Sequence, residues 1–452
     1  MSRLNVPLER PPVLTHEGGP AYPHLNAEQQ LRRSVLSCLL WEEGYYENGQ
    51  SIADRIVENA EKVPIETLAA LAHEARSKFH LRHVPLLLLS VLARRGRGNS
   101  LVSCAIANTI QRADELAEFL VVYARLNGVT PDKVKPKLSA QVKKGLAQAF
   151  ASFDEYNLQK YNRDGAIKLR DVMFMVHPRP DNDEQAAMWK RLASKELATP
   201  ETWEVLLSSG KAKKETFESL IREGKLGYFA LLRNLRNMQQ AGCDEKLVLD
   251  AVRARGHGAY RVLPFRYIAA ARAVPMWEAA IDEALCASIE ESPVLPGTTV
   301  VLVDISGSMD SPLSAKSDLK RCDAAATLAS VIRCEKLRVF SFSGEIREVP
   351  PRRGLAGVDA VLNSQPHGST RLGAAIEHIN AQVPHDRLIV ISDEQTEDRV
   401  PTPVARKAYM LNVASSQNGV GYGKGWTAHF DGFSEGIIRY IAETERQDSK
   451  DI

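Results

Sequence analysis

The chain has 452 residues, of which 44% are apolar and 25% charged, and its formal net charge is +2. This length exceeds what one core normally supports, so two or three domains are expected, and the composition excludes a disordered or fibrous chain. No segment has the character of a signal peptide or a membrane span, which predicts a cytoplasmic protein that does not contact a membrane. Six cysteines without a C-x-x-C pair favour reduced thiols over disulfides or a zinc site.

The first predicted domain is helical. Residues 1–24 are rich in Pro and Gly and predict an irregular arm, whereas apolar residues recur at helical spacing across residues 25–293. The predicted helices are 26–41, 52–63, 64–78, 84–94, 101–110, 114–126, 134–153, 183–194, 200–208, 217–223, 228–239 and 244–253. Many short helices in succession indicate stacked, HEAT-like helix pairs, and one irregular bundle is the alternative.

The pattern changes after Pro296 and Gly297. Residues 294–452 alternate strand and helix patterns, which predicts a doubly wound α/β domain. The expected strands are 299–304, 338–341, 346–349, 388–392 and 408–413, and the expected helices are 319–333, 355–363, 372–382 and 436–444.

Three oxygen-bearing side chains follow the first of these strands. The strand is a β-branched run typical of a strand buried on both faces, and it ends in Asp304, with Ser306 and Ser308 next. Open α/β sheets bind ligands at such strand ends. An all-oxygen set favours a divalent cation such as Mg²⁺ over zinc or copper. A phosphoryl-accepting aspartate is a weaker interpretation, because Ser306 stands where such sites carry a second acid.

These residues resemble the DxSxS signature of the metal-ion-dependent adhesion site in von Willebrand factor A domains. The resemblance implies that Thr370, at the start of the helix 372–382, and Asp393, at the end of the strand 388–392, complete the site. Each acid taken alone is better explained as a helix N-cap, and it is the whole set in the family's order and spacing that indicates a metal site. Sites of this family bind a partner's carboxylate through an open coordination position, which implies recognition and not catalysis.

Two long intervals contain no acidic residue. One lies between Glu74 and Asp114, the other between Asp250 and Glu278. The second interleaves arginines with glycines and aromatic residues, a pattern that suits phosphate contact combined with base stacking on unpaired nucleotides. In the competing interpretation these arginines lie near helix C-termini, where their positive charge interacts favourably with the helix dipole.

Three segments in their order along the chain resemble Ro/TROVE proteins. They are the Leu-Leu-Arg-Asn-Leu-Arg-Asn-Met run from Leu231, the Arg-Gly-His-Gly run from Arg255, and the DxSxS motif at Asp304. The resemblance covers nearly the whole chain. It implies a ring of helical repeats closed by the A domain, without enzymatic activity. It also implies that small noncoding Y-type RNAs bind the outer surface and that single-stranded ends of misfolded RNAs bind the central hole.

The resemblance and the second acid-free interval define the expected RNA contacts. The residues implied for Y-type RNA are Lys160, Arg163 and His177. The remaining RNA-binding candidates are Arg233, Arg236, Arg253, Arg255, His257, Arg261 and Arg266. A nuclease or another protein is the expected partner at the metal site. The alternative function is a metal-dependent interaction adaptor whose helical domain binds protein, which would not need the acid-free intervals.

Overall fold

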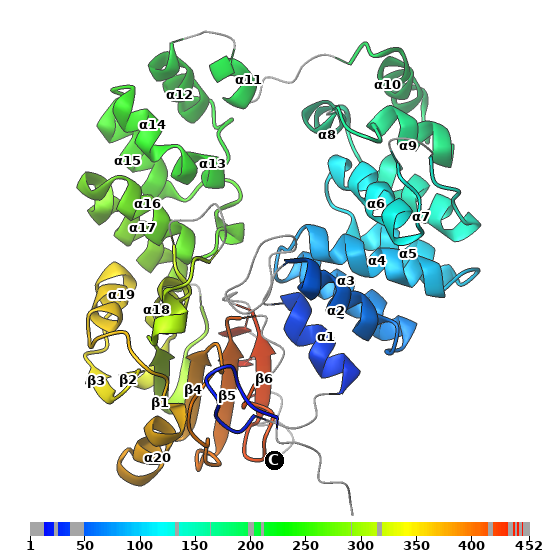
Figure 1. Cartoon of the computed structure of the whole chain (residues 1–452). Helices are drawn as coiled ribbons and strands as arrows, with labels where there is room; N and C mark the ends of the chain where they lie inside the picture. The colour runs from blue at the N-terminus through cyan, green and yellow to red at the C-terminus, as the bar shows by residue number, and fades with distance from the viewer. Residues whose placement is uncertain are drawn as a thin grey trace, which may run out of the picture. The chain divides into compact units, whose positions relative to one another are not determined.

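The computed structural model describes residues 13–21, 26–36, 49–131, 135–162, 164–197, 203–208, 212–290, 292–313, 319–414, 419–432, 437–438, 441–442 and 445. The chain divides into two compact units. The helical unit comprises residues 39–41 and 49–285, and the sheet unit comprises residues 1–38, 42–48 and 286–452. Figure 1 shows helices in the first and an open sheet with flanking helices in the second, which confirms the predicted fold class.

The helical unit consists of short helices joined by short connections. They are α2 (Gly49–Ala60), α3 (Ile65–Ser77), α4 (His83–Arg95), α5 (Ser100–Thr109), α6 (Ala113–Leu126), α7 (Ala140–Ala151), α8 (Glu155–Tyr161), α9 (Leu169–Val176), α10 (Asp183–Ser194), α11 (Trp203–Ser208), α12 (Lys213–Arg222), α13 (Tyr228–Arg233), α14 (Leu235–Gln240), α15 (Glu245–Ala254), α16 (Phe265–Ala273) and α17 (Glu278–Glu290). The sequence did not predict α8, α9, α16 or α17. It also merged α13 and α14, which are separated at Asn234.

Helices of this unit pack on their near neighbours in the chain. α3 contacts α4 and α5, α4 contacts α6, and α5 contacts α7. The α5–α7 approach is close: a Cβ atom on Gly145 of α7 would lie 2.7 Å from the carbonyl oxygen of Ser103 and 2.9 Å from Cβ of Ile106. Contacts between sequence neighbours are typical of helical repeats and agree with the stacked-pair prediction.

The sheet unit contains a six-stranded sheet in the order β3-β2-β1-β4-β5-β6. Its strands are β1 (Leu295–Asp304), β2 (Cys334–Phe342), β3 (Ile346–Val349), β4 (Arg387–Ser392), β5 (Lys407–Asn412) and β6 (Ala428–Asp431). β3 pairs antiparallel with β2, and all other pairs are parallel. The five predicted strands are present. β6 was not predicted, and the expected helix 436–444 lies mostly outside the described residues.

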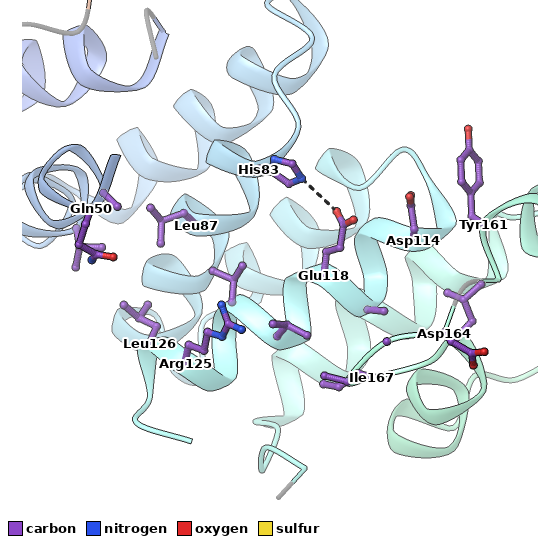
Figure 2. A pocket seen from close by; sticks show the side chains of 18 of the residues that line it. Gln50, His83, Leu87, Asp114, Glu118, Arg125, Leu126, Tyr161, Asp164 and Ile167 are labelled. Carbon is purple, nitrogen blue, oxygen red and sulfur yellow. Dashed lines mark ion pairs between the residues drawn. The ribbon is translucent and has the colours of Figure 1, made fainter. Parts of the chain in front are cut away.

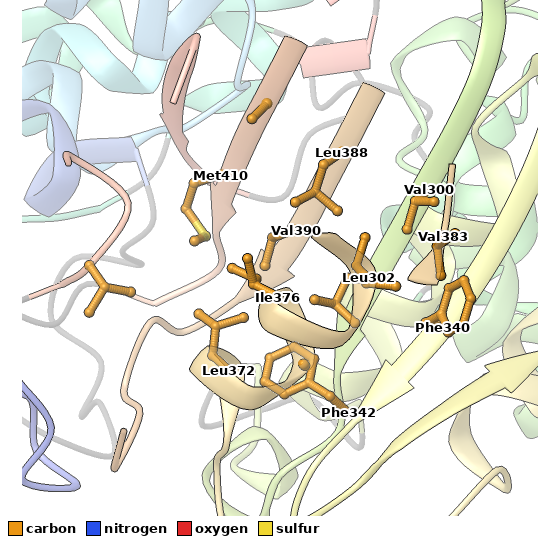
Figure 3. Packing of buried hydrophobic residues seen from close by; sticks show 14 residues of the cluster. Val300, Leu302, Phe340, Phe342, Leu372, Ile376, Val383, Leu388, Val390 and Met410 are labelled. Atoms are coloured by element: carbon orange, nitrogen blue, oxygen red, sulfur yellow. The ribbon is translucent and has the colours of Figure 1, made fainter. Parts of the chain in front are cut away.

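Helices cover both faces of this sheet. The helices are α18 (Arg321–Val331), α19 (Gly354–Leu362) and α20 (Leu372–Gln382). Leu372 and Ile376 of α20 pack against Leu302 and Val390 in a fully apolar cluster (Figure 3). Side chains alternate along a strand, so the equally buried Val301 and Val303 face the opposite side, where α18 contacts β1 and β4.

The N-terminal part of the chain belongs to the sheet unit. Helix α1 (Ala27–Leu36) contacts the edge strand β6, although the sequence pattern grouped this helix with the helical repeats. Residues 13–21 form a small loop closed by a bridge between Leu14 and Pro20. Among the helices described, none is both long and apolar enough to cross a membrane.

Candidate functional site

Two carboxylates predicted as metal ligands meet at one edge of the sheet. Asp304 is the last residue of β1, and Asp393 directly follows β4. β1 and β4 are adjacent and parallel, with Val303 paired to Ile391, so both acids reach the same carboxyl edge, Asp393 one residue further along its strand than Asp304. The strand order reverses between β1 and β4, and doubly wound sheets bind their ligands at such a reversal.

Hydrogen bonds hold the first loop of this site. The backbone N–H of Ser306 donates to Oδ1 of Asp304 at 2.9 Å, and the hydroxyls of Ser306 and Ser308 lie 3.2 Å apart. The hydroxyl of Ser392 donates to Oδ2 of Asp304 at 2.6 Å. The sequence analysis did not single out Ser392, although its place before Asp393 at the strand end was a usable signal.

The loop that carries Thr370 is joined to both strand-end loops. The N–H of Gly307 donates to the carbonyl of Gly368 at 2.8 Å, and the hydroxyl of Thr396 donates to the carbonyl of Thr370 at 2.9 Å. The side chains of the five predicted ligands are all buried. The structure thus brings the three predicted loops together.

Electrostatics at this edge favour a bound cation. Burial, together with the nearby negative charge of Asp393, raises the pKa of Asp304 to about 7. Two buried carboxylates repel each other, and a divalent ion between them removes both the repulsion and the desolvation penalty. The donors are carboxylate and hydroxyl oxygens, so the residues fit Mg²⁺ or a similar hard cation.

The residue after Asp393 is locked by a buried ion pair with the N-terminal helix. Glu394 has a left-handed backbone (φ 61°), and its side chain pairs with Arg33 of α1 and with His429 of β6. Its Oε2 accepts hydrogen bonds from the N–H groups of Val420 and Gly421 at 2.8 and 2.7 Å. Burial opposes the charge of Glu394, but Arg33 and His429 outweigh it and hold the pKa of Glu394 well below its usual range.

The N-terminal loop clamps the same segment two residues further on. The hydroxyl of Thr15 and the N–H of Gly19 both donate to the carbonyl of Thr396, at 2.5 and 3.0 Å. A Cβ atom on Gly19 would lie 2.3 Å from that carbonyl oxygen, so the approach requires glycine. Because Thr396 also bonds the Thr370 loop, the N-terminal segment supports two of the three metal-site loops.

The structure brings two candidate RNA-binding arginines together on one aromatic ring: Arg266 of the second acid-free interval and Arg233, which precedes it in the chain. The guanidinium carbons of Arg233 and Arg266 lie 5.6 and 5.4 Å from the ring centre of Phe229, and Arg266 also stacks on Phe265 at 4.9 Å. Both arginines and Phe229 are exposed. Partial burial of Arg266 against the rings and the like charge of Arg233 lower the pKa of Arg266. This arginine–phenylalanine cluster (Phe229, Arg233, Phe265, Arg266) concentrates positive charge, and a bound anion would reduce the repulsion between its two arginines.

The other candidates of this region have more varied surroundings. Arg236 is exposed and donates to the carbonyl of Ala273 at 3.4 Å, whereas Arg253 pairs with Glu283 at 2.6 Å. Three further candidates follow α15: Arg255 has a left-handed backbone, His257 is exposed, and Arg261 lies in a 3-10 turn with its side chain outside the described part.

Arginines of the first acid-free interval are engaged within the helical unit. Arg82 pairs with Asp114 and Glu118 of α6, and Arg94 pairs with Glu61. These acids lie outside the interval in the sequence, so the local lack of acids does not produce a free basic surface at these arginines.

The residues implied for Y-type RNA lie around α8 and α9. The ammonium of Lys160 lies 5.5 and 5.7 Å from the ring centres of Tyr156 and Tyr161, and Tyr156 is exposed. His177 ends α9 in a left-handed conformation and is exposed. Arg163 is outside the described residues.

A cavity of about 660 Å³ opens beside Tyr161 in the helical unit. Figure 2 shows apolar side chains such as Leu87, Leu126 and Ile167 in its lining, and His83 paired with Glu118 at 3.8 Å. Burial raises the pKa of Glu118, while burial and the charge of Arg82 lower the pKa of His83. The cavity is thus apolar inside, with acidic groups among its polar residues.

The metal site yields a prediction. Mg²⁺ should raise the melting temperature of the wild-type protein, because the ion binds the folded and not the unfolded chain. At a hundred times Kd it adds about 2.7 kcal/mol to the free energy of unfolding. Asp304→Asn should abolish this shift, whereas Asp359→Asn, which changes an exposed carboxylate of the same unit, should keep it. Melting curves recorded with Mg²⁺ and with a chelator measure the shift. If Mg²⁺ raised the melting temperature of Asp304→Asn as much as that of the wild type, the assignment of the metal site would be contradicted.

The buried ion pair yields a second prediction. Arg33→Met should lower the free energy of unfolding by about 3–5 kcal/mol, because it leaves the Glu394 carboxylate buried without its arginine. Urea unfolding measures this change, and the double variant Arg33→Met/Glu394→Gln should recover part of it. Equal stability of wild type and Arg33→Met would refute a structural role for the pair.

The pair also sets a dependence on pH. Because the folded-state pKa of Glu394 lies below its unfolded value of about 4.3, the carboxylate stabilises the protein above that pH. This contribution is lost as the pH falls through the lower folded-state value. Below pH ~4 the difference in stability between wild type and Arg33→Met should therefore narrow.

Comparison with known proteins agrees with this architecture. A family model described as the TROVE domain matches residues 182–286, the stretch that contains the arginine–phenylalanine cluster. The crystal structure of the Deinococcus radiodurans Ro (Rsr) protein is similar, with a TM-score of 0.59 and 16% identity, over 92% of this chain and 100% of that one. No match was found among curated proteins. Residues 182–286 are therefore similar to the TROVE domain, and the chain as a whole has the fold of the Ro protein.

Proposed function

We propose that this is a cytoplasmic, non-catalytic RNA-binding protein of the Ro type, which scaffolds small noncoding Y-type RNA and captures single-stranded ends of misfolded RNA. Possession of a TROVE domain implies RNA binding. The observation that carries the proposal is the arginine–phenylalanine cluster, where Arg233 and Arg266 share the exposed ring of Phe229. An adaptor that binds only protein has no need of such a cluster.

The chemistry of this cluster suits unpaired nucleotides. Arginine presents several donors in a planar fork that matches phosphate oxygens, and an exposed ring or guanidinium plane stacks on any base. Two guanidinium groups held close together are each destabilised by the other's charge, and a phosphate between them relieves this repulsion. The single-stranded ends of misfolded RNA are therefore assigned to this surface.

Y-type RNA is assigned to the surface around Lys160, Arg163 and His177. Lys160 lies over two tyrosines, one of them exposed, so this surface also combines positive charge with aromatic rings. The two surfaces belong to different helices of the same unit, α8 to α9 and α13 to α16. Because the two surfaces are separate, the protein could bind a Y-type RNA and the single-stranded end of a misfolded RNA at the same time.

The sheet unit contributes recognition in this proposal. A hard cation held by Asp304, Ser306, Ser308, Thr370 and Asp393 would present positive charge at the sheet edge and accept a carboxylate from a nuclease or another protein. The RNA-binding residues lie in the other unit. Loss of the cation is therefore expected to leave RNA affinity largely intact.

Single-stranded RNA binding provides a direct test. Replacing Arg233 and Arg266 together by Gln should weaken binding and reduce the log–log salt slope by ~1.4, since each phosphate contact on a single strand contributes ~0.7. Phe229→Ala should cost about 1–3 kcal/mol if a base stacks on the ring. Fluorescence anisotropy over a salt series measures both effects.

The matched control is Arg222→Gln, which removes an exposed arginine of α12 that pairs with Glu218 at 2.9 Å. It should bind single-stranded RNA like wild type. If the double variant retains wild-type affinity and salt slope, the single-strand site lies elsewhere.

A second test separates the two RNA surfaces. Lys160→Ala combined with Arg163→Ala should reduce binding of a structured, Y-like RNA more than binding of a single-stranded oligonucleotide, because only the former is assigned to this surface. The Arg233/Arg266 double variant should show the opposite preference. Equal losses for both RNAs in both variants would mean that a single undivided basic surface binds them.

A further inference from the structure

A thiol, an imidazole and a carboxylate converge in the sheet unit next to the predicted Mg²⁺ site. Among the described residues, ligand atoms of Asp310, Cys322 and His367 all lie within 4.8 Å of one another. Asp310 ends the short turn that follows the DxSxS loop, Cys322 lies in the first turn of α18, and His367 precedes the Thr370 loop. We propose that these three residues bind a borderline-soft divalent metal ion of the Zn²⁺ class.

The donor set distinguishes this site from its neighbour. Thiolate and imidazole are preferred ligands of Zn²⁺ and related ions, whereas Mg²⁺ takes oxygen ligands. The predicted Mg²⁺ site is built from oxygens alone, and the Asp310–Cys322–His367 group offers one sulfur, one nitrogen and one carboxylate. The two groups would therefore select different ions although they share a loop.

The distances match a small tetrahedral site. Zinc–ligand bonds of about 2.0–2.3 Å place neighbouring ligand atoms roughly 3.4–3.6 Å apart. Here Nδ1 of His367 lies 3.0 Å from Oδ2 of Asp310, and Sγ of Cys322 lies 3.8 Å from Oδ1 of Asp310. The three ligand atoms all lie within 4.8 Å of one another, so side-chain adjustment without a change of fold can bring them to one ion.

The orientation of His367 suits metal binding. Its Nε2 lies 3.1 Å from the carbonyl oxygen of Leu362, so this nitrogen carries the hydrogen and donates it. The other nitrogen, Nδ1, then directs a lone pair at the carboxylate of Asp310, an arrangement that requires a proton or a metal ion between them. A backbone carbonyl that fixes the imidazole in this way is typical of metal-binding histidines.

The surroundings leave one coordination position for water or an external ligand. Cys322 is buried, but Asp310 and His367 are partly exposed, with side-chain exposures of 34% and 23%. Lys320 pairs with Oδ1 of Asp310 at 2.7 Å and competes with the ion for one carboxylate oxygen. Burial and the charges of Asp323 and Asp310 raise the pKa of the Cys322 thiol to about 12, so an ion that binds sulfur must displace its proton.

Cobalt(II) titration of the untagged, metal-stripped full chain tests the proposal. Co²⁺ should bind with one equivalent of thiolate-to-metal absorption in the near ultraviolet, and Zn²⁺ should displace it. Cys322→Ser should abolish the band. Cys104→Ser, which alters an exposed cysteine of the helical unit, should retain it.

Asp304→Asn separates the two metal sites, because it disrupts the oxygen site and should leave the thiolate band unchanged. His367→Gln provides a variant that keeps the cysteine and should weaken Zn²⁺ binding at least roughly tenfold in a competition with a chromophoric chelator. Circular dichroism shows whether each variant is folded. Absence of the band in folded wild-type protein, its persistence in Cys322→Ser, or unchanged Zn²⁺ affinity in folded His367→Gln would overturn the proposal.

Discussion

The parallel, in-register pairing of β1 with β4 is the constraint on which the functional face of the sheet unit depends. It brings Asp304 and Asp393 to one edge of the sheet and buries both. Burial of two like charges is unfavourable, so the edge is most stable with a cation. The Ser306 and Thr370 loops are then hydrogen-bonded around those strand ends. The metal site proposed here depends on sheet topology as much as on the identity of the residues.

The N-terminal segment contacts the loop that follows β4, close to Asp393. Arg33 and Thr15 hold Glu394 and Thr396, the residues that follow Asp393, although several hundred positions separate them in the sequence. A buried ion pair adds little net stability over an apolar pair, yet loss of one partner is costly. The segment therefore fixes the position of the loop that follows Asp393, and the proposed metal site depends on it.

The two acid-free intervals have different roles in the structure. In the first, arginines such as Arg82 and Arg94 are paired with acids from neighbouring helices. In the second, Arg253 is paired in the same way, but Arg266 of α16 meets Arg233 of α13, which lies outside both intervals, on the ring of Phe229. A stretch of sequence without acids therefore does not by itself produce a positively charged surface, because acids from other helices can pair with its arginines. Only the cluster that keeps its charge exposed supports recognition of a polyanion.

The sequence by itself determined the features that depend on local order: the succession of short helices, the doubly wound sheet, and the DxSxS loop at the end of a buried strand. Helical and strand periodicities extend over few residues, and a strand end marks where side chains leave the core, so such patterns need no tertiary information. Tertiary structure alone decided that α1 lies with the sheet, that β6 completes it, and that Arg33 neutralises Glu394. It also decided that Cys322 meets His367 and Asp310, where scattered cysteines had suggested only reduced thiols. Each of these is a contact between segments far apart in the chain, whose partners are selected by packing and burial of charge and leave no periodic pattern in the sequence.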